Sequence, residues 1–519
     1  MERGITTYLK RNNPVTVTQR LVNYKKVRSL LCLRPVSLEA SLEAERKKGF
    51  FRQNRWRFSK KVKCLIVFAI VAVMLVSIFA FLPRGSQSTP NKPQSSDNPT
   101  ASPSATNNQT GSNTLSQFAQ FFSNLAGSAA QAFSPPKAPG LIESAQTINS
   151  TVWRAVAANA WQYFQPGVGV DSNTGLPYNG GTRSPYFTDW DLGVYIQAVI
   201  DAQNLNLTTT DGAWGSYARL DKVLTWLETR ELNATTSYPY WFYQATDGKD
   251  YHADSDKATV PVDVVDTGRL FVALNNLRNF NNTLMTRINN ITLYGQLYGR
   301  SNYTALVGGI ASSATSNSIY AYYVCSGFAS FWPNQLANVT DTILNNIFNS
   351  GNVTSPYGNV SLPNAPISCE PLLCSVFELN NTDSSRLMGL MSQVYLAHEA
   401  YYNATGQYVA FSEGNSPNGF VWEWVATGSG DTWKITQSGS SSYLDMKPVV
   451  YNKVAFSFLA LYNTTFARNM VVYLEQSLPD PTNGYSDGAD NSGNLVSSVG
   501  SNTNGLILDA ALYAIQNNP

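Results

Sequence analysis

The stretch VDVVDTGRLFVALNNLRNF, residues 262–280, combines an acidic start with a long apolar face at helical spacing. Apolar residues recur three and four positions apart, which predicts an α-helix with Asp266 in its first turn. Burial there would raise the pKa of Asp266 unless Arg269 or a backbone N–H kept the carboxyl ionised. The alternative is an internal ion pair between Asp266 and Arg269. In either case the stretch predicts a helix that begins at a buried or half-buried acid.

The same periodicity occurs in windows on both sides of this stretch and predicts about eleven helices. The windows are residues 151–164, 189–204, 217–232, 262–280, 283–297, 303–323, 335–348, 384–402, 447–462, 465–474 and 505–515. Long loops rich in Gly, Asn, Ser and aromatic residues separate them, such as residues 163–187 and 412–445. The second loop also alternates well enough to form a small β-hairpin or sheet. Antiparallel helices with alternately short and long loops fit a mainly α fold, an (α/α) toroid, whose long loops line a cleft at one end.

Residues 140–519 are long enough for one large core or for two ordinary domains. No second low-complexity linker divides them. We therefore expect one folded domain.

Residues 64–82, CLIVFAIVAVMLVSIFAFL, contain no charged side chain. Nineteen helical residues extend about 28 Å, close to the thickness of the hydrocarbon core of a bilayer. The segment thus predicts one transmembrane helix before the folded domain. A cleaved signal peptide is the competing interpretation, but 63 residues precede the run and Phe81-Leu82-Pro83-Arg84 is not a small-x-small cleavage site.

Charge is distributed unequally about this span. Residues 1–63 hold 17 Lys or Arg and four acids, a net charge of +13, so the remainder of this +2 chain carries −11. Positive residues remain on the cytoplasmic side of a membrane, which predicts a cytoplasmic N-terminus and an extracellular domain. The basic segment lacks aromatic or glycine residues interspersed in a pattern that could recognise nucleic-acid bases. We therefore expect it to face lipid headgroups and not nucleic acid. Residues 83–139, rich in Ser, Thr and Pro, predict a disordered stalk.

Asn-x-Ser/Thr sequons support the same orientation, because none lies in residues 1–63. An Asn- and Thr-rich composition would produce part of them by chance, but it explains the asymmetry less easily. Thirteen follow the span, at Asn108, Asn149, Asn206, Asn233, Asn281, Asn290, Asn302, Asn338, Asn352, Asn359, Asn380, Asn403 and Asn463.

Cysteine and histidine are too scarce to suggest metal or nucleophilic chemistry. Beyond the span lie three cysteines, Cys325, Cys369 and Cys374, which allow one disulfide of open pairing. Of the two histidines, His398 lacks the second histidine of a zinc protease helix and is expected to be an ordinary helix residue. We expect no metal and no cofactor, so any catalysis must depend on carboxylates.

Two groups of acids stand out because charged residues make up just 13% of the chain. Asp189 and Asp191 flank Trp190 at the predicted start of a helix. Asp189 could equally be a cap that accepts backbone N–H bonds, whereas Asp191 points elsewhere. Together with Asp266 they are candidates for a catalytic base or nucleophile and for substrate contacts.

Glu413 and Glu423 lie among Phe and Trp in the aromatic loop. Glu423 alternates with Trp422 and Trp424 as in a strand, so one face would carry the glutamate and the other two indoles. Glycosidases need two carboxylates, one kept protonated by apolar neighbours, beside aromatic faces on which sugar rings stack. Glu413 is accordingly the candidate acid, and Trp422, Glu423 and Trp424 are candidate substrate-binding residues.

The C-terminal residues 483–513 hold an acidic Gly/Asn loop followed by a helix. The loop lacks the spacing of an EF-hand, so calcium is not predicted. Asn502 and Asn504 are expected to cap the last helix and to line the mouth of the cleft.

At these positions the domain resembles the domain-of-unknown-function 3131 family over residues 150–519. Five motifs occur in the family's order: Trp190-Asp191, Asp266-Thr267-Gly268-Arg269-Leu270, Ser412-Glu413, Lys453-Val454-Ala455-Phe456 and residues 501–509. The resemblance implies an (α/α) toroid of the kind shared by many glycoside hydrolases, and bacterial relatives are associated with extracellular polysaccharide. The chain departs from the pattern at Asp509, where the family has Glu, and in an Asn-rich middle at residues 281–382.

The sequence therefore favours a membrane-anchored extracellular protein that acts on carbohydrate, with Asp191 or Asp266 as base or nucleophile and Glu413 as acid. Asp189, Trp190, Arg269, Trp422, Glu423, Trp424, Asn502 and Asn504 would contact the glycan. The alternative is a non-catalytic surface glycoprotein, such as an adhesin, an envelope component or a glycan-binding scaffold, which suits the sequons and the stalk equally well.

Overall fold

The structure, a computed structural model, describes residue 142 and residues 148–180, 184–295, 301–379, 381–437, 440, 442–477 and 483–517. The predicted basic segment (1–63), membrane span (64–82) and stalk (83–139) lie outside these residues. Within the described residues no helix is long and apolar enough to cross a membrane.

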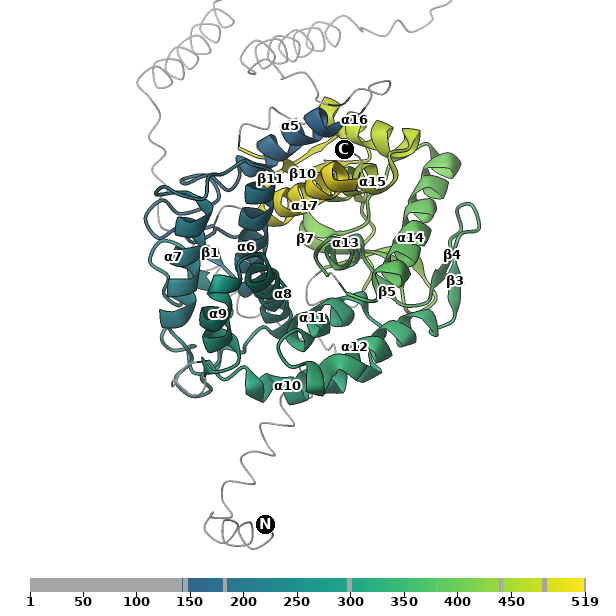
Figure 1. Cartoon of the computed structure of the whole chain (residues 1–519). Helices are drawn as coiled ribbons and strands as arrows, with labels where there is room; N and C mark the ends of the chain where they lie inside the picture. Colours follow the sequence, from purple (N-terminus) through teal and green to yellow (C-terminus); the bar gives the residue numbers. More distant parts are fainter. Residues whose placement is uncertain are drawn as a thin grey trace, which may run out of the picture. The chain divides into compact units, whose positions relative to one another are not determined.

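Six inner helices form a closed ring, in which each helix contacts the next and the last contacts the first. Figure 1 views this ring almost end-on. The helices are α6 (Asp189–Asn204), α8 (Val264–Phe280), α11 (Ile319–Ala329), α13 (Cys369–Glu378), α15 (Asn452–Tyr462) and α17 (Ser501–Asn517). The predicted (α/α) toroid is therefore confirmed for the described part of the chain.

An outer layer of helices alternates with the inner ring along the chain, and its members pack against inner helices from outside. These are α5 (Ser150–Trp161), α7 (Ser216–Thr229), α9 (Met285–Thr292), α10 (Thr304–Ala311), α12 (Pro333–Phe348), α14 (Ser384–Thr405) and α16 (Thr465–Ser477), with the short 3₁₀ turns η1 (Asn282–Leu284) and η3 (Ser312–Thr315). The inner helices are thereby covered on nearly every side, and 14 of the 16 residues of α6 are buried.

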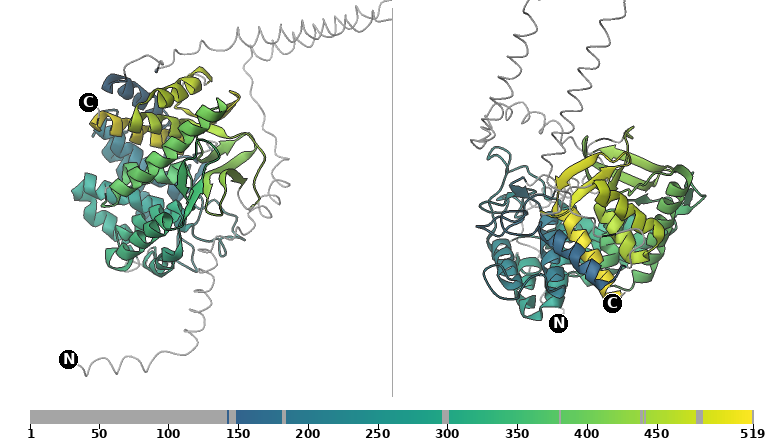
Figure 2. Two further views of the ribbon diagram at one scale, coloured as in Figure 1. Left: turned by 90° about the vertical axis from the view of Figure 1, so that its right-hand side faces the viewer. Right: turned by 90° about the horizontal axis from the view of Figure 1, so that it is seen from above.

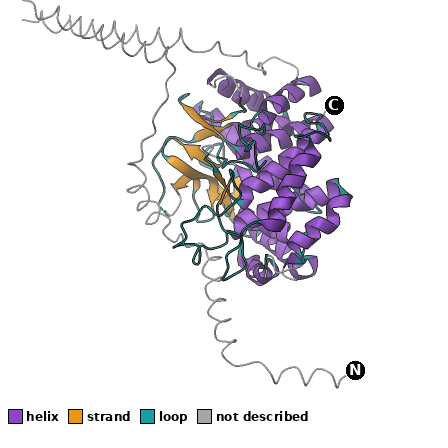
Figure 3. Ribbon diagram, turned by 90° about the vertical axis from the view of Figure 1, so that its left-hand side faces the viewer, coloured by secondary structure: helices purple, strands orange, loops and turns teal. Residues whose placement is uncertain are grey.

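The strands gather at one end of the helices, as Figures 2 and 3 show. They belong to the segments that precede inner helices: β1 (Tyr186–Phe187), β2 (Tyr243–Gln244), β3 (Asn352–Thr354), β4 (Ser361–Pro363), β5 (Pro366–Ile367), β6 (Glu413–Ser416), β7 (Gly419–Thr427), β8 (Thr432–Gln437), β9 (Val449–Tyr451), β10 (Ser486–Asp490) and β11 (Leu495–Val499). Antiparallel pairs join β1 to β2, β5 to β7 and β9 to β10. Because each of these pairs joins segments that lead into different inner helices, those helices start at the same end of the ring.

The predicted hairpin in residues 412–445 is confirmed, since β7 pairs with both β6 and β8. Several helix predictions differ from the structure. The window 447–462 starts too early, because strand β9 takes Val449–Tyr451 and α15 begins at Asn452. The single window 303–323 divides into outer α10 and inner α11. Helix α13 was not predicted, because its ten residues are too few to show a sustained helical period.

The cysteines of the described residues are free and buried, so no disulfide joins Cys325, Cys369 and Cys374. His398 is also buried, and its ring bonds the carbonyl oxygen of Val394 and accepts the backbone N–H of Phe411. Burial lowers the pKa of His398 to about 4. The histidine is therefore a neutral core residue of α14, as the sequence predicted.

Two glycines bring α8 and α11 into close contact. A Cβ atom at Gly268 would lie 2.6 Å from the side chain of Val324 and 2.9 Å from its Cα. A Cβ atom at Gly327 would lie 2.1 Å from the carbonyl oxygen of Gly268. The ring can close at this distance because neither position carries a side chain.

We expect Gly268→Ala to lower the free energy of unfolding by about 1–3 kcal/mol, since overpacking forces the two helices apart. Thermal and denaturant unfolding would measure this loss. Gly389→Ala in α14 is the matched control, because this exposed helical position has open space around it. The control should be neutral or stabilising by up to about 1 kcal/mol. Equal effects of the two substitutions would contradict the close-packing argument.

Candidate active site

Each inner helix begins with polar side chains in its first turn, at the end of the ring where the strands lie. Helix N-termini carry free N–H groups and a partial positive charge, which favour carboxylates and other acceptors. These first turns surround the mouth of the ring. The residues include Asp189 and Asp191 on α6, Asp266 on α8, Tyr320 on α11, Glu370 on α13, Lys453 on α15, and Ser501 and Thr503 on α17.

Asp191 completes the cap of α6. Thr188 is the N-cap, and one carboxyl oxygen of Asp191 accepts the backbone N–H of Thr188 at 3.0 Å. The other oxygen accepts from the backbone of Gly180 at 2.9 Å and from the hydroxyl of Ser501 at 3.1 Å. Burial raises the pKa of Asp191 to about 6. Asp191 therefore fastens the first loop and α17 to the start of α6.

Asp189 forms a buried ion pair with Arg230 at 2.6 Å. It also accepts a hydrogen bond from the hydroxyl of Thr267 on α8, while Arg230 donates to the hydroxyl of Tyr303. The carboxylate thus links α6 to α8 and to the loop before α8.

Asp266 is half-buried in the first turn of α8, next to the N-cap residue Asp263. The carboxylate of Asp263 accepts the backbone N–H groups of Val265 and Asp266. Burial raises the pKa of Asp266 well above its ordinary value, and the negative charges of Asp263, Asp191 and Asp189 add to this shift. Asp266 and its neighbours therefore form one acidic group at the mouth.

Arg269 turns away from Asp266 and enters the interior of the ring. It forms an ion pair with Glu378 of α13 and donates to the hydroxyl of Tyr323. The proposed internal pair between Asp266 and Arg269 is therefore not formed.

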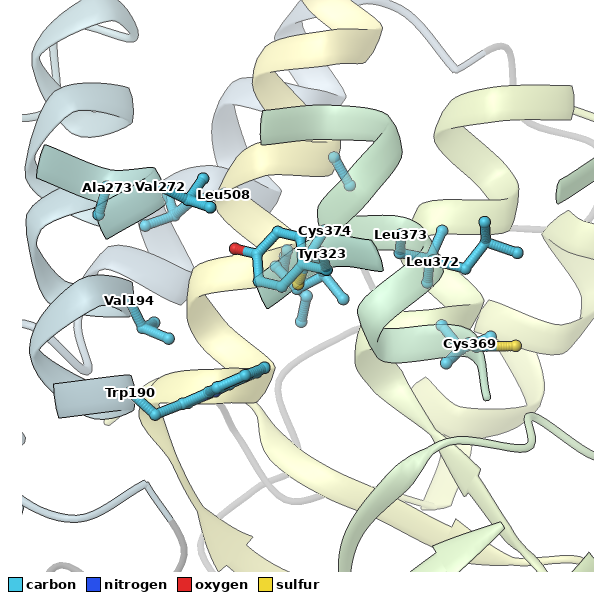
Figure 4. Packing of buried hydrophobic residues seen from close by; sticks show 14 of the residues in the cluster. Trp190, Val194, Val272, Ala273, Tyr323, Cys369, Leu372, Leu373, Cys374 and Leu508 are labelled. Carbon is cyan, nitrogen blue, oxygen red and sulfur yellow. The ribbon is translucent and has the colours of Figure 1, made fainter. Parts of the chain in front are cut away.

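The ring interior also holds Trp190. Figure 4 shows it extending from α6 below Tyr323. Arg269 lies 5.6 Å from the centre of its ring. The indole N–H is buried and has no acceptor among the described residues.

Glu413 forms the second acidic group, across the mouth on β6. It is 7% exposed and accepts a hydrogen bond from the hydroxyl of Tyr320. Beneath it, Glu370 and Lys453 form a buried ion pair between α13 and α15. Burial raises the pKa of Glu413 to about 8, and the charge of Glu370 adds to the rise, whereas Lys453 and Tyr320 oppose it. The surroundings of Glu413 thus favour its protonated form.

Strand β7 separates its side chains as the alternation predicts. Glu423 is fully buried, and its carboxylate accepts the backbone N–H of Val449 at 2.8 Å. Trp422 and Trp424 on the opposite face are half-buried. Trp424 packs edge-on against Tyr320 at 6.2 Å, so the indole face of β7 lies beside Glu413. Glu423 supports this strand from behind and does not reach the mouth.

The two asparagines at the start of α17 differ in their surroundings. Asn504 is fully buried and exchanges hydrogen bonds with the backbone of Tyr485. Asn502 is half-buried and its amide oxygen lies near Gly180, without a donor among the described residues. Asn504 therefore fixes the start of β10, while Asn502 remains close to the mouth.

A family model described as "Protein of unknown function (DUF3131)" matches residues 155–517. The chain belongs to this family. The match covers the inner ring and the strand end.

Two solved structures have a fold similar to that of this chain. An endo-beta-1,2-glucanase from Talaromyces funiculosus, in complex with sophorose, has a TM-score of 0.50 at 10% identity, over 71% of this chain and 85% of the glucanase. A candidate glucoamylase from Bacteroides uniformis has a TM-score of 0.50 at 13% identity, over 72% of this chain and 93% of that protein. At such identities the likeness shows the fold alone. No curated protein matches the chain by sequence.

Sequence reasoning missed several polar groups of this DUF3131 domain. Tyr320, Glu370 and Asp263 were not singled out as site residues, and Lys453 entered just as part of a motif. A single charged residue inside the apolar runs SCEPLLC and NKVAFSFLA was the available signal, since an unpaired charge is costly to bury. The partner of each charge lies 83 positions away, so the pair itself could not be read from the sequence.

We expect Glu370→Met and Lys453→Met each to cost about 3–5 kcal/mol of stability, because each leaves a buried charge without its partner. The double variant should recover most of this loss, since two apolar side chains replace the pair. Urea unfolding of the four proteins would give the coupling energy. Additive losses in the double variant would show that the two charges act independently.

Proposed function

We propose that this domain is a glycoside hydrolase in which Glu413 is the general acid and Asp266 the base or nucleophile. The observation that carries the proposal is the state of Glu413. It is a carboxyl group kept protonated by burial at the mouth of the ring, in a hydrogen bond with Tyr320 and beside half-buried indoles. A glycosidase acid needs this combination, because it must hold a proton at the working pH and donate it to the leaving oxygen.

Asp266 suits the second role better than Asp191. Both oxygens of Asp191 are already engaged by the backbone of Thr188 and Gly180 and by Ser501. Asp266 remains half-buried at the mouth, so solvent and ligand can reach it. A raised pKa also makes its ionised form a stronger base towards water.

Trp422 and Trp424 would supply the apolar surface for a sugar ring next to Glu413. The structural neighbours support a glucan as the substrate class, because one is named an endo-beta-1,2-glucanase and is bound to sophorose. β-1,2-Glucan is therefore the first substrate to test, followed by starch and mixed-linkage β-glucan.

The test is hydrolysis of these polysaccharides by the full-length protein in detergent micelles. Glu413→Gln and Asp266→Asn should each lower kcat/KM by about 10²-fold or more, the usual contribution of a general acid or base. Asp211→Asn, in an exposed loop after α6, is the control and should keep full activity. Activity that survives both active-site substitutions would reject the assignment, and glycan binding without any hydrolysis would favour the scaffold alternative.

The pH profile gives a second readout of the same prediction. Activity should fall above about pH 8, because Glu413 then loses its proton. The acidic limb should follow ionisation of Asp266. Asp263→Asn removes a charge that raises the pKa of Asp266, and asparagine remains a good N-cap. This variant should therefore move the acidic limb to lower pH and leave the alkaline limb in place. A shift in the opposite direction would exclude Asp266 as the base.

We propose further that the domain lies outside the cell, anchored by residues 64–82. The charge asymmetry and the sequons support this arrangement, and the sequon residues Asn149, Asn206, Asn338, Asn352, Asn359, Asn403 and Asn463 are exposed on the domain. Asn233 is different, because it is 1% exposed and donates to the carbonyl oxygen of Lys257.

Protease added to intact cells should remove residues 140–519 and spare an N-terminal tag, because the two would lie on opposite sides of the membrane. In a glycosylating host, mass spectrometry should find glycans at exposed sequons and an unmodified Asn233, since transfer needs an accessible side chain. Immunoblotting of the tag and the domain reports the cleavage. Protection of the domain would overturn the orientation.

A further inference from the structure

Ten of the 11 tryptophans lie in the folded domain, and seven of these belong to the core or pack against it. The other three are Trp241, Trp422 and Trp424. The last two form the indole face of β7 beside Glu413. Trp241 lies elsewhere, in the segment that leads into β2, and it has no place in the proposed site.

Trp241 belongs to a group of four aromatic rings that we call the β1–β2 aromatic surface: Tyr186, Trp241, Phe242 and Tyr251. Trp241 and Phe242 stack at 4.8 Å, and Tyr186 contacts Phe242 at 5.3 Å and Tyr251 at 4.9 Å. Three of the rings are half-buried and Tyr251 is 46% exposed. None of the four packs against the hydrophobic core. The rings hold one another in place and present a preformed apolar surface to solvent.

Polar groups border this surface closely. The Nδ1 atom of His252 lies 2.7 Å from Asp250, and the ring of His252 contacts Phe242 at 5.8 Å. Lys257 bridges Asp250, Asp254 and Glu231 at 3.2–3.7 Å. A few aromatic rings within a rim of hydrogen-bonding groups match a pyranose ring, whose C–H faces stack on aromatic rings while its hydroxyl groups hydrogen-bond at the edge.

The β1–β2 aromatic surface borders the acidic group on α6 and α8. Strand β1 ends at Phe187, two residues before α6, and β2 lies in the loop that leads to α8. The charge of Asp191 also contributes to the raised pKa of Tyr186, after burial and the charge of Tyr251. The surface therefore lies next to the acidic group at the start of α6.

The indoles of β7 lie on the other side of the mouth. The ring order α6, α8, α11, α13, α15, α17 places α13 opposite α6 and α15 opposite α8. Strands β5 and β7 precede α13 and α15, whereas β1 and β2 precede α6 and α8. With neighbouring helices about 8–10 Å apart, opposite members of a six-helix ring are roughly 16–20 Å apart. We expect a disaccharide to occupy just one of the two aromatic surfaces.

We propose that the β1–β2 aromatic surface is a second carbohydrate-binding position and that the ligand is a glycan chain that spans the mouth from Trp422 to Trp241. This proposal rests on the proposed function for the nature of the ligand. The carboxyl groups then act on an internal stretch of the chain. Affinity grows with chain length until both surfaces are filled.

Affinity electrophoresis in gels that contain β-1,2-glucan, mixed-linkage β-glucan or amylose tests the proposal with the full-length Glu413→Gln protein in micelles. At least one polymer should retard it, and Trp241→Ala with Tyr251→Ala should weaken that retardation about tenfold, as expected when exposed aromatic anchors are lost. Tyr294→Ala is the matched control, since Tyr294 is 45% exposed on the outer layer. Retardation by none of the three polymers, or equal retardation of the double variant and the control, would overturn the proposal.

Competition with oligosaccharides separates this inference from the hydrolase assignment. The test uses the disaccharide unit of the polymer that retards the protein. This disaccharide should bind the double variant as well as it binds the Glu413→Gln protein, because it fills just the position near Glu413. Weak disaccharide binding with strong, Trp241-dependent polymer binding supports the second position even if hydrolysis is never found. Hydrolysis of polymer with the same KM in the double variant would overturn the second position and leave the hydrolase intact.

Discussion

The structure depends on one constraint: the inner helices of the ring begin at the same end, so their unpaired backbone N–H groups converge around one mouth. Acceptors must be supplied there, and the chain supplies them as carboxylates. Asp191 caps α6 and Asp263 caps α8. The acids that gather at this end are thus partly explained by the need to complete the helices. An acid at this end can therefore be a helix cap or a candidate catalytic residue, and residue type alone does not distinguish the two.

The ring interior requires partners for buried charges, because helices that are covered on nearly every side still carry charged residues. Arg269 pairs with Glu378 and Tyr323. Nearby, Asp509 of α17 faces Asp201 of α6. Burial raises the pKa of Asp509 well above its ordinary value, and the charge of Asp201 adds to it. One proton can therefore be shared where the first and last inner helices meet. The interior is held by polar pairs as well as by apolar packing.

The carboxyl groups on the two sides of the mouth have different surroundings. The acids near α6 and α8 neighbour one another and are tied to backbone donors and to Arg230. Glu413 instead lies near a neutralised pair, Glu370 and Lys453, and accepts hydrogen bonds from the side chains of Tyr320 and Trp422. Different surroundings give these carboxyl groups different pKa values, about 6 for Asp191 and about 8 for Glu413, although their chemistry is the same. The aromatic rings follow the same division, with one group at β7 and another at β1 and β2.

Local pattern determined much of this protein. The 3.6-residue period located most helices, the alternation in residues 419–427 located β7 and assigned Glu423 and the indoles to opposite faces, and five ordered motifs located the family. These features are readable because each depends on neighbours within a few residues.

Tertiary structure decided the rest. Helix α13 is just ten residues long, and its place in the ring follows from packing against α11, α15 and α17. Asp189 is buried in an ion pair because Arg230, 41 positions away, reaches it in the closed ring. The proton on Glu413 depends on Tyr320, Glu370 and Lys453, which belong to three different helices. Such effects join residues that are far apart in the chain. These residues come within contact distance when the ring has closed.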